Sequence, residues 1–187
     1  MNDNELIEKK VLSREIFNGD IVHLFKDNII LPNGKGATRE VIKHCGAVAI
    51  VPILEDGSVI LERQFRYPIN SVITEIPAGK TDCEGENIID AARRELLEET
   101  GYEAGKLIPI GDLYTSPAFL TEVIHMFVAT DLTFKGRHLD EDEFINIFTM
   151  PLCELCGKIL SGEICDAKTQ LSVLKAKMLI DSGSIKI

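Results

Sequence analysis

The chain has 187 residues, of which 45% are hydrophobic and 27% are charged, and its formal net charge is −10 at pH 7. This length suits one domain, or one domain with a small appendage, and the composition is typical of a folded globular protein rather than a disordered one. The acidic balance argues against broad nucleic-acid binding, which needs a basic surface, and implies that an anionic ligand would need a cation to mediate its binding.

The first 44 residues are predicted to form a small antiparallel β-domain. Short apolar runs alternate there with turn signals, and Asn18-Gly19 and Asn33-Gly34 each stand between two such runs. Asn-Gly pairs in this position favour hairpins, because both residues tolerate the positive φ angles of tight turns. We therefore expect an N-terminal β-domain at 1–44 and a larger domain at 45–187.

The larger domain is predicted to be a mixed sheet flanked by helices, of the α/β or α+β class. Residues 46–54 form one apolar run, which indicates a strand buried on both faces. After a turn at 55–57, the alternating segment 58–66 is expected to return as its hairpin partner. Further strands are predicted at 71–77, 125–130 and 143–150, and helices at 86–100, 151–160 and 166–181.

The chain carries no sign of export or of membrane insertion. Its longest apolar run, 47–54, is far too short to cross a bilayer, and its polar, acidic N-terminus is unlike a secretory signal. Its five cysteines, an odd number, suggest reduced thiols. We therefore expect a cytoplasmic protein that binds neither membranes nor nucleic acid.

The predicted helix at 86–100 concentrates negative charge on one side. Glu95, Glu98 and Glu99 share a face because residues three and four apart are neighbours on a helix. Bunched carboxylates are the oxygen ligands that a hard divalent cation such as Mg²⁺ prefers. The alternative is an ordinary solvated acidic face that Arg93 and Arg94 partly neutralise.

The spacing of these residues favours the metal interpretation. Glu86, seven residues and then the run RELLEETGY at 94–102 resemble the Nudix box, whose pattern is G-x5-E-x7-R-E-U-x-E-E-x-G-U, with U an apolar residue. One departure is visible, since six residues rather than five separate Gly79 from Glu86. The resemblance implies a pyrophosphohydrolase with the Nudix α/β/α sandwich, preceded here by the small N-terminal β-domain.

The segments around the box resemble the ADP-ribose pyrophosphatase branch of this superfamily. They include LERQFRYPI at 61–69, EIPAGK at 75–80, YTSPAFLTEVIHMFVATDL at 114–132 and LDEDEF at 139–144. The resemblance extends from about residue 10 to about residue 180. Cys45 and Ala118 depart from it, because a proline and a glycine are usual at these positions.

The resemblance implies a set of metal ligands. Glu95 and Glu99 are expected to bind Mg²⁺, with Mn²⁺ as the alternative, together with the backbone carbonyl of Ala78. Glu98 lies on the same face and is expected to be a further ligand, or a neighbour bridged by water, in the catalytic cluster.

The resemblance also implies supporting and catalytic roles. Arg94 is expected to orient the carboxylates through charge-assisted hydrogen bonds, with Glu86 as its partner. In this branch the catalytic base usually lies outside the box, on an acidic loop. Here Glu141 is the predicted base and Glu143 a further metal ligand, although the two can exchange roles. The alternative is that both belong to an exposed acidic loop.

Three residues are candidates for binding the substrate. Arg66 resembles the phosphate-binding arginine of the family, and Arg39 is a second candidate near the nucleotide end. Either arginine can instead be a surface cation. Glu122, in the loop after Ser116-Pro117, is the candidate for contacting the terminal ribose.

These observations predict a Mg²⁺-dependent enzyme that cleaves ADP-ribose to AMP and ribose 5-phosphate. The family resemblance further implies a homodimer in which the N-terminal strands help to build the partner's nucleotide pocket. Two alternatives stay open. The substrate can be another nucleoside diphosphate sugar or a dinucleotide of the FAD or NAD type, or the chain can be a non-catalytic nucleotide-binding regulator.

Overall fold

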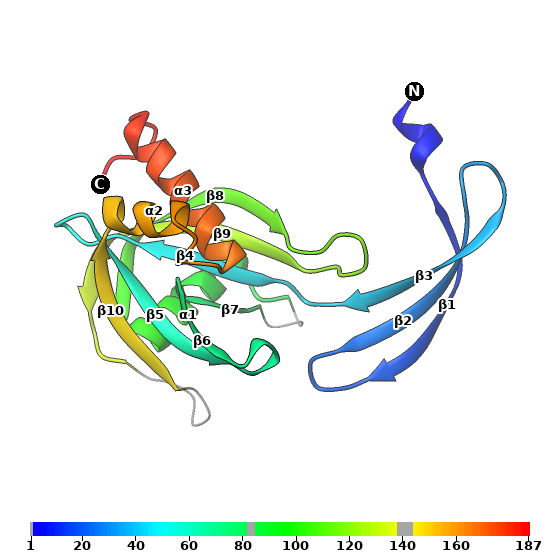
Figure 1. The fold of residues 1–187 in the computed structure, drawn as a ribbon, viewed down its shortest axis with the longest axis horizontal. Helices are drawn as coiled ribbons and strands as arrows, with labels where there is room; N and C mark the ends of the chain where they lie inside the picture. Colours follow the sequence, from blue (N-terminus) through cyan, green and yellow to red (C-terminus); the bar gives the residue numbers. More distant parts are fainter. Residues whose placement is uncertain (1, 82–84, 138–143) are drawn as a thin grey trace. The chain divides into compact units, whose positions relative to one another are not determined.

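The computed structural model describes residues 2–81, 85–137 and 144–187, and the chain divides into two compact units (Figure 1). The first unit comprises Met1–Cys45 and Tyr114–Glu122, and the second comprises Gly46–Leu113 and Val123–Ile187. The N-terminal unit therefore includes a loop that comes from the middle of the chain.

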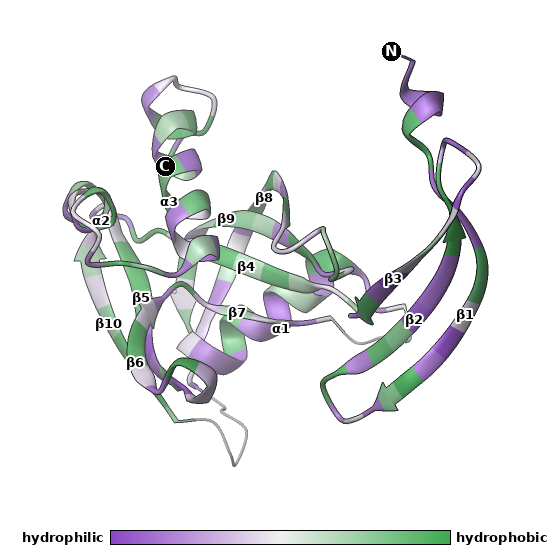
Figure 2. Cartoon of the chain, turned by 45° about the vertical axis from the view of Figure 1, so that its right-hand side comes forward, coloured by the Kyte–Doolittle hydropathy of each residue, from purple (hydrophilic) through white to green (hydrophobic). Residues whose placement is uncertain are grey.

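The first unit is a three-stranded antiparallel sheet in the order β1-β2-β3. A short 3-10 helix, η1 (Asp3–Leu6), precedes β1 (Lys9–Asn18), β2 (His23–Ile30) and β3 (Gly36–Lys43). The register pairs Asn18 with His23 and Ile30 with Gly36, which confirms hairpins at both Asn-Gly pairs. Hydrophilic and hydrophobic residues alternate along these strands (Figure 2).

In its described residues, the second unit contains two sheets, three α-helices and one short 3-10 helix. One sheet has the order β7-β4-β9-β8 and the other β10-β5-β6. The first is mixed, because β4 pairs with β9 in parallel and with β7 antiparallel. The strands are β4 (Ala47–Pro52), β5 (Ser58–Arg66), β6 (Ser71–Glu75), β7 (Ala78–Lys80), β8 (Tyr102–Tyr114), β9 (Val123–Phe134) and β10 (Ile145–Pro151). The helices are η2 (Tyr67–Ile69), α1 (Ile88–Thr100), α2 (Leu152–Leu160) and α3 (Ala167–Asp181).

Strand β4 is the centre of the core of the second unit. All six of its residues are buried, and its side chains alternate between two clusters because successive residues of a strand face opposite sides. Val48 and Ile50 pack in the cluster that contains Ala91, Ala92 and Leu96 of α1. The opposite face of β4 belongs to a larger cluster that includes residues of α2 and α3. Helices therefore cover both faces of the strand, as the predicted sandwich requires.

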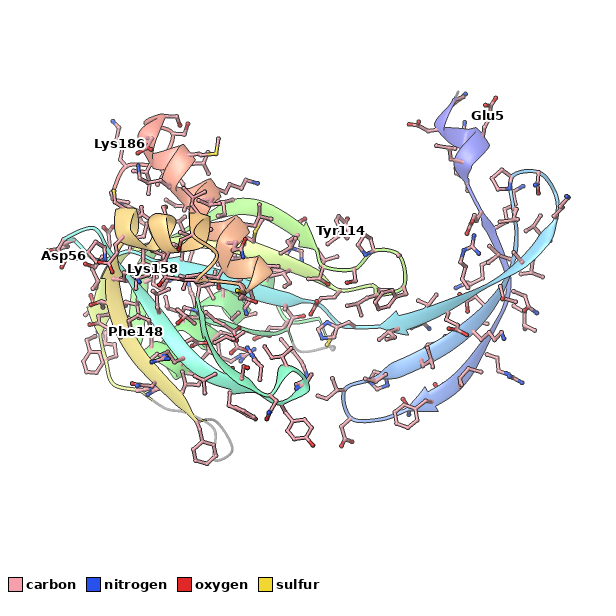
Figure 3. All side chains as sticks on the ribbon, viewed as in Figure 1. Glu5, Asp56, Tyr114, Phe148, Lys158 and Lys186 are labelled. Atoms are coloured by element: carbon pink, nitrogen blue, oxygen red, sulfur yellow. The ribbon has the colours of Figure 1, made fainter. Side chains whose placement is uncertain are left out.

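One predicted strand pairing is wrong. The turn at 55–57 is present, with Asp56 (labelled in Figure 3) accepting a 2.9 Å hydrogen bond from the Ser58 amide. Beyond it only an isolated bridge joins Ile53 to Val59, and β5 pairs instead with β6 and β10. Strands β4 and β5 thus belong to different sheets. The alternation of apolar and polar residues within a strand does not reveal which strand lies beside it.

The other predicted elements agree with the structure, apart from their ends. The strand at 71–77 and the helices at 151–160 and 166–181 are present, and the central helix begins at Ile88 rather than at residue 86. The sequence did not predict β7 or β8. Among the described residues, no helix is long and apolar enough to span a membrane.

Candidate active site

The ends of α1 are fixed by local capping. The side chain of Asn87 accepts a 2.9 Å hydrogen bond from the Ile89 amide, which satisfies one of the free donors at the start of the helix. At the other end, Gly101 adopts a φ of 79°, and its amide donates to the carbonyl of Leu97. Such a left-handed cap is far easier for glycine than for other residues. Between its caps, the helix buries Leu96 against β4.

This packing turns two glutamates of α1 toward β7. Glu95 and Glu99 are only 8% and 4% exposed. Oε2 of Glu99 accepts a 3.0 Å hydrogen bond from the backbone amide of Ala78. The carboxyl group of Glu95 lies so close to Gly79, the residue after Ala78, that a Cβ atom on Gly79 would overlap it. The two carboxylates are thus held against the β7 backbone at the residues where the sequence predicts a metal site.

Arg94 connects the remaining acidic residues of the cluster. Its Nε and Nη2 atoms each donate a 3.0 Å hydrogen bond to one oxygen of Glu86. Its Nη1 atom donates to Glu95 at 2.7 Å and to Glu98 at 3.1 Å. These bonds, led by those to Glu86, raise the pKa of Arg94 above its ordinary value. The structure therefore brings Arg94 together with Glu86, its predicted partner, and with Glu95 and Glu98, two of the three carboxylates that it was predicted to orient.

The donor set of this cluster fits a hard divalent cation. Glu95, Glu98 and Glu99 supply only oxygen ligands, and the Arg94 guanidinium pairs with three carboxylates, those of Glu86, Glu95 and Glu98. Glu98 is the more accessible member, with 40% of its side chain exposed. In the part of the chain that the structure describes, no three His, Cys, Asp or Glu side chains already converge as a complete metal site. Arg94 bridges the carboxylates in their present arrangement.

A second charged cluster surrounds Glu75 at the end of β6. Its side chain is 1% exposed and accepts hydrogen bonds from Nε of Arg66 at 2.6 Å and from Nη2 of Arg66 at 2.8 Å. Nζ of Lys168 also bonds to Glu75 and lies 3.1 Å from Asp166. Burial alone would raise the pKa of Glu75, but the hydrogen bonds from Arg66 and Lys168 outweigh it and lower the pKa below its usual value.

Arg66, a predicted phosphate ligand, is itself partly accessible. Its side chain is 39% exposed, and the hydrogen bond to Glu75 raises the pKa of its guanidinium. The buried carboxylate of Glu62 contributes a further favourable charge interaction with Arg66.

The other two predicted substrate residues lie in the first unit. Arg39 forms an ion pair with Glu8, and Nε of Arg39 donates a 3.0 Å hydrogen bond to it. Glu122 accepts a 2.7 Å hydrogen bond from the hydroxyl of Thr115. The predicted base Glu141 and its neighbour Glu143 lie outside the described residues.

Neither Glu75 nor Lys168 is among the site residues predicted from the sequence. The available signal was a single charged residue within the otherwise uncharged segment SVITEIP at 71–77, beside the apolar residues Ile76 and Pro77. A charge in such a position requires a partner of opposite sign. Its partner Lys168 is 93 residues away in the sequence, so spacing did not identify it.

Three comparisons with known proteins each found a match. The NUDIX domain model matches residues 43–169. An ADP-ribose pyrophosphatase of Bacillus subtilis (strain 168) is 42% identical over 170 residues, which are 90% of this chain and 91% of that protein. A methanol dehydrogenase activator of Bacillus methanolicus is 40% identical and covers 89% of this chain and 90% of its own length. Among solved structures, the crystal structure of an ADP compounds hydrolase has a TM-score of 0.82, covers 95% of this chain and 97% of its own, and is 23% identical, so this likeness concerns the fold.

Proposed function

We propose that this chain, which belongs to the NUDIX domain family, is an enzyme that hydrolyses the diphosphate bond of ADP-ribose to AMP and ribose 5-phosphate. The observation that carries the proposal is the pair of buried carboxylates, Glu95 and Glu99, held against the β7 backbone. The name of the Bacillus subtilis relative supports the choice of ADP-ribose within the wider class of nucleoside diphosphate sugars.

The cluster on α1 and β7 is the proposed metal site. Members of this family use divalent metals, and we propose Mg²⁺, with Mn²⁺ as the alternative, held by Glu95, Glu99 and the carbonyl of Ala78, with Glu98 as a further ligand. When bound, such an ion offsets the phosphate charge and lowers the pKa of a coordinated water. Arg94 and Glu86 keep the carboxylates oriented by the hydrogen bonds described above.

The remaining steps fall to other residues of the chain. Arg66 is proposed to bind phosphate oxygens with the part of its guanidinium that Glu75 leaves free. Glu141 is proposed to take the proton of the water that attacks phosphorus, in line with the departing phosphate oxygen. Glu143 is the proposed additional ligand. Arg39 and Glu122 are proposed to contact the nucleotide and the terminal ribose.

The first unit supports a proposed homodimer. Among residues 2–45 and 114–122, Ile29 alone is a buried hydrophobic residue. Nine large apolar side chains in 6–30 are 37% or more exposed: Leu6, Ile7, Val11, Leu12, Ile16, Phe17, Ile21, Val22 and Ile30. A three-stranded sheet with so small a core needs further apolar contacts to be stable. We therefore propose that residues 1–44 serve dimerisation and substrate binding. The cytoplasmic location expected from the sequence is a separate proposal.

A substrate panel tests the activity. The purified chain with Mg²⁺ is incubated with ADP-ribose, GDP-mannose, FAD and NAD, and the products are separated by chromatography, with Glu99→Gln as the blank for contaminating hydrolases. We expect the highest kcat/KM with ADP-ribose, with AMP and ribose 5-phosphate released in equal amounts. A higher kcat/KM on another of these compounds would make that compound the proposed substrate in place of ADP-ribose. If wild type and the Glu99→Gln blank gave equal, negligible turnover on all four, the non-catalytic regulator would become the better interpretation.

A further inference from the structure

Glu75 is a buried carboxylate that two cations share. Arg66 uses its Nε and Nη2 atoms to hold both oxygens of Glu75, and Lys168 bonds to the same Oε2 atom that Nη2 of Arg66 contacts. The two basic residues come from different elements, Arg66 from the end of β5 and Lys168 from the first turn of α3. The carboxylate therefore connects the helix to the end of the strand.

The contact with Glu75 leaves part of Arg66 available. A guanidinium has five N–H donors in a planar fork, and a two-bond contact with a carboxylate uses two of them. The two donors of Nη1 and one of Nη2 remain, on a side chain that is 39% exposed. Because the fork is planar, the orientation of the Glu75 carboxylate determines where these remaining donors point.

Lys168 is in turn held in place by its own helix. Its side chain is only 12% exposed and lies 3.1 Å from Asp166, which caps α3 by accepting a 2.9 Å hydrogen bond from the Thr169 amide. Thr169 also accepts a 3.0 Å hydrogen bond from the amide of Ile76, the residue after Glu75. The first turn of α3 thus contacts two consecutive residues at the end of β6.

We propose that Lys168 is a positioning residue for Arg66: by fixing the Glu75 carboxylate, it sets the plane of the Arg66 guanidinium so that the Nη1 donors face a phosphate of the substrate. The inference rests on the proposed function and deepens it, because it adds Lys168 and Glu75 to the phosphate-binding apparatus. Without Lys168 the Glu75 side chain loses one of its two anchors and can rotate together with Arg66. The phosphate contact is then weakened, although Arg66 itself is unchanged.

Kinetics of four variants test this role. Lys168→Met removes the ammonium, Lys168→Arg restores a cation, Glu75→Gln weakens the contact from the other side, and Lys175→Met is the control on the same helix. We expect Lys168→Met to raise the KM for ADP-ribose about tenfold while kcat changes less than about threefold. Lys168→Arg should recover most of the affinity, Glu75→Gln should resemble Lys168→Met, and Lys175→Met should match wild type.

A double-variant comparison separates positioning from a general structural effect. In an Arg66→Ala background, Lys168→Met should change KM less than about twofold, because the residue through which it acts is absent. An equal change in both backgrounds, or a wild-type KM for folded Lys168→Met, would overturn the inference. If Lys168→Met proves unstable on heating, the same comparison is made with Lys168→Gln, which removes the charge but keeps a polar side chain.

Calorimetric titration with inorganic pyrophosphate and Mg²⁺ makes the test independent of the substrate. Lys168→Met should bind pyrophosphate about tenfold more weakly than wild type. Equal affinity would refute the positioning role whatever the enzyme hydrolyses. Failure of the wild type to hydrolyse ADP-ribose would instead refute the proposed substrate. The pyrophosphate affinities of wild type and Lys168→Met would then still test the positioning role of Lys168.

Discussion

The backbone amide of Ala78 and Oε2 of Glu99 lie 3.0 Å apart, although the two residues are 21 positions apart in the sequence. The contact ties the three-residue strand β7 to the last turn of α1. A carboxylate that is 4% exposed requires such a donor, because an unbonded buried charge is very costly. The same strand residue carries the carbonyl proposed as a metal ligand, so one contact fixes the distance between two of the proposed ligands.

Glu99→Gln should abolish turnover and leave the fold nearly intact. The amide has almost the shape of the carboxylate and can still accept from the Ala78 amide, but it has lost the charge that a divalent cation requires. We expect kcat/KM for ADP-ribose to fall at least about 10³-fold, since metal-assisted activation of water is lost. Kinetics and circular dichroism measure the two effects. Glu154→Gln, on the exposed face of α2, is the control and should retain wild-type activity.

Gly79→Ala should separate activity from stability. The added methyl group would overlap the Glu95 carboxyl group, which is the flexible end of its side chain and can move away. Movement costs little stability but displaces a proposed metal ligand. We expect kcat/KM to fall about 10²-fold or more, with the free energy of unfolding reduced by no more than about 1–2 kcal/mol.

Gly157→Ala is the control for this substitution. An added Cβ at residue 157, in α2, meets no atom within 4 Å. It should leave activity unchanged and maintain or slightly raise stability, because alanine is the better helix former. Wild-type activity in Gly79→Ala would show that the position of Glu95 does not matter for turnover.

Arg94→Lys should weaken the metal site while keeping the charge. A lysine cannot hold Glu86 with two bonds and also reach Glu95 and Glu98, as the guanidinium does. We expect the Mg²⁺ concentration for half-maximal activity to rise about tenfold and the free energy of unfolding to fall by about 1–2 kcal/mol.

The neighbouring arginine offers a matched comparison. Arg93 donates a 2.6 Å hydrogen bond to the carbonyl of Ala104 and, among the described residues, forms no hydrogen bond or ion pair with the acidic cluster, so Arg93→Lys should leave the Mg²⁺ dependence unchanged. Equal shifts in both variants would indicate a general effect on α1 rather than a specific orienting role.

The parts of this fold that were predicted from the sequence are those that local interactions determine. The helix around Glu95 ends locally, at the cap formed by Gly101, and the hairpin at Asn18-Gly19 followed from turn chemistry. The buried strand at 46–54 followed from its unbroken apolar run. In each case the residues that decide the structure lie within a few positions of one another.

The parts that were missed depend on contacts between distant segments. The segment 58–66 alternates like a hairpin partner of β4, yet its neighbours are β6 and β10, and alternation does not specify which strand lies alongside. The pairing of Glu75 with Lys168 spans 93 positions. The sequence therefore predicted the carboxylates of one helix, whereas the arrangement around Arg66 required the folded chain.

Acid should destabilise the protein partly through Glu75. Its pKa is lowered in the folded state, where the bonds from Arg66 and Lys168 outweigh its burial, and Asp166 and Glu62 are the acidic groups nearby. A group with a depressed folded pKa contributes stability that is fully present above its ordinary pKa, near 4.5, and is lost as the pH falls through the lower folded pKa. We therefore expect the free energy of unfolding to decline below about pH 4.5.

Urea denaturation of Glu75→Gln between about pH 3 and pH 7 checks this dependence. The variant leaves two cations without their shared carboxylate, so it should be less stable at neutral pH. The loss should be smaller than the roughly 3–5 kcal/mol of a fully buried pair, because Arg66 is 39% exposed and Lys168 keeps Asp166 as a partner. It should also lose less stability than wild type on acidification. Parallel declines in the two proteins would assign the acid sensitivity to other carboxylates.

The exposed apolar side chains of the first unit predict a homodimer in solution. Light scattering should give twice the 20.7 kDa mass of one chain at micromolar concentration. Leu12 is 59% exposed on β1, and Leu12→Lys should weaken the dimer at least about tenfold, because a charge would have to be buried at the interface. Leu160, 79% exposed on α2, provides the same substitution outside the first unit and should leave the mass unchanged. A wild-type mass near that of one chain would mean that this sheet is stabilised without a second copy, and its apolar residues would then need another explanation.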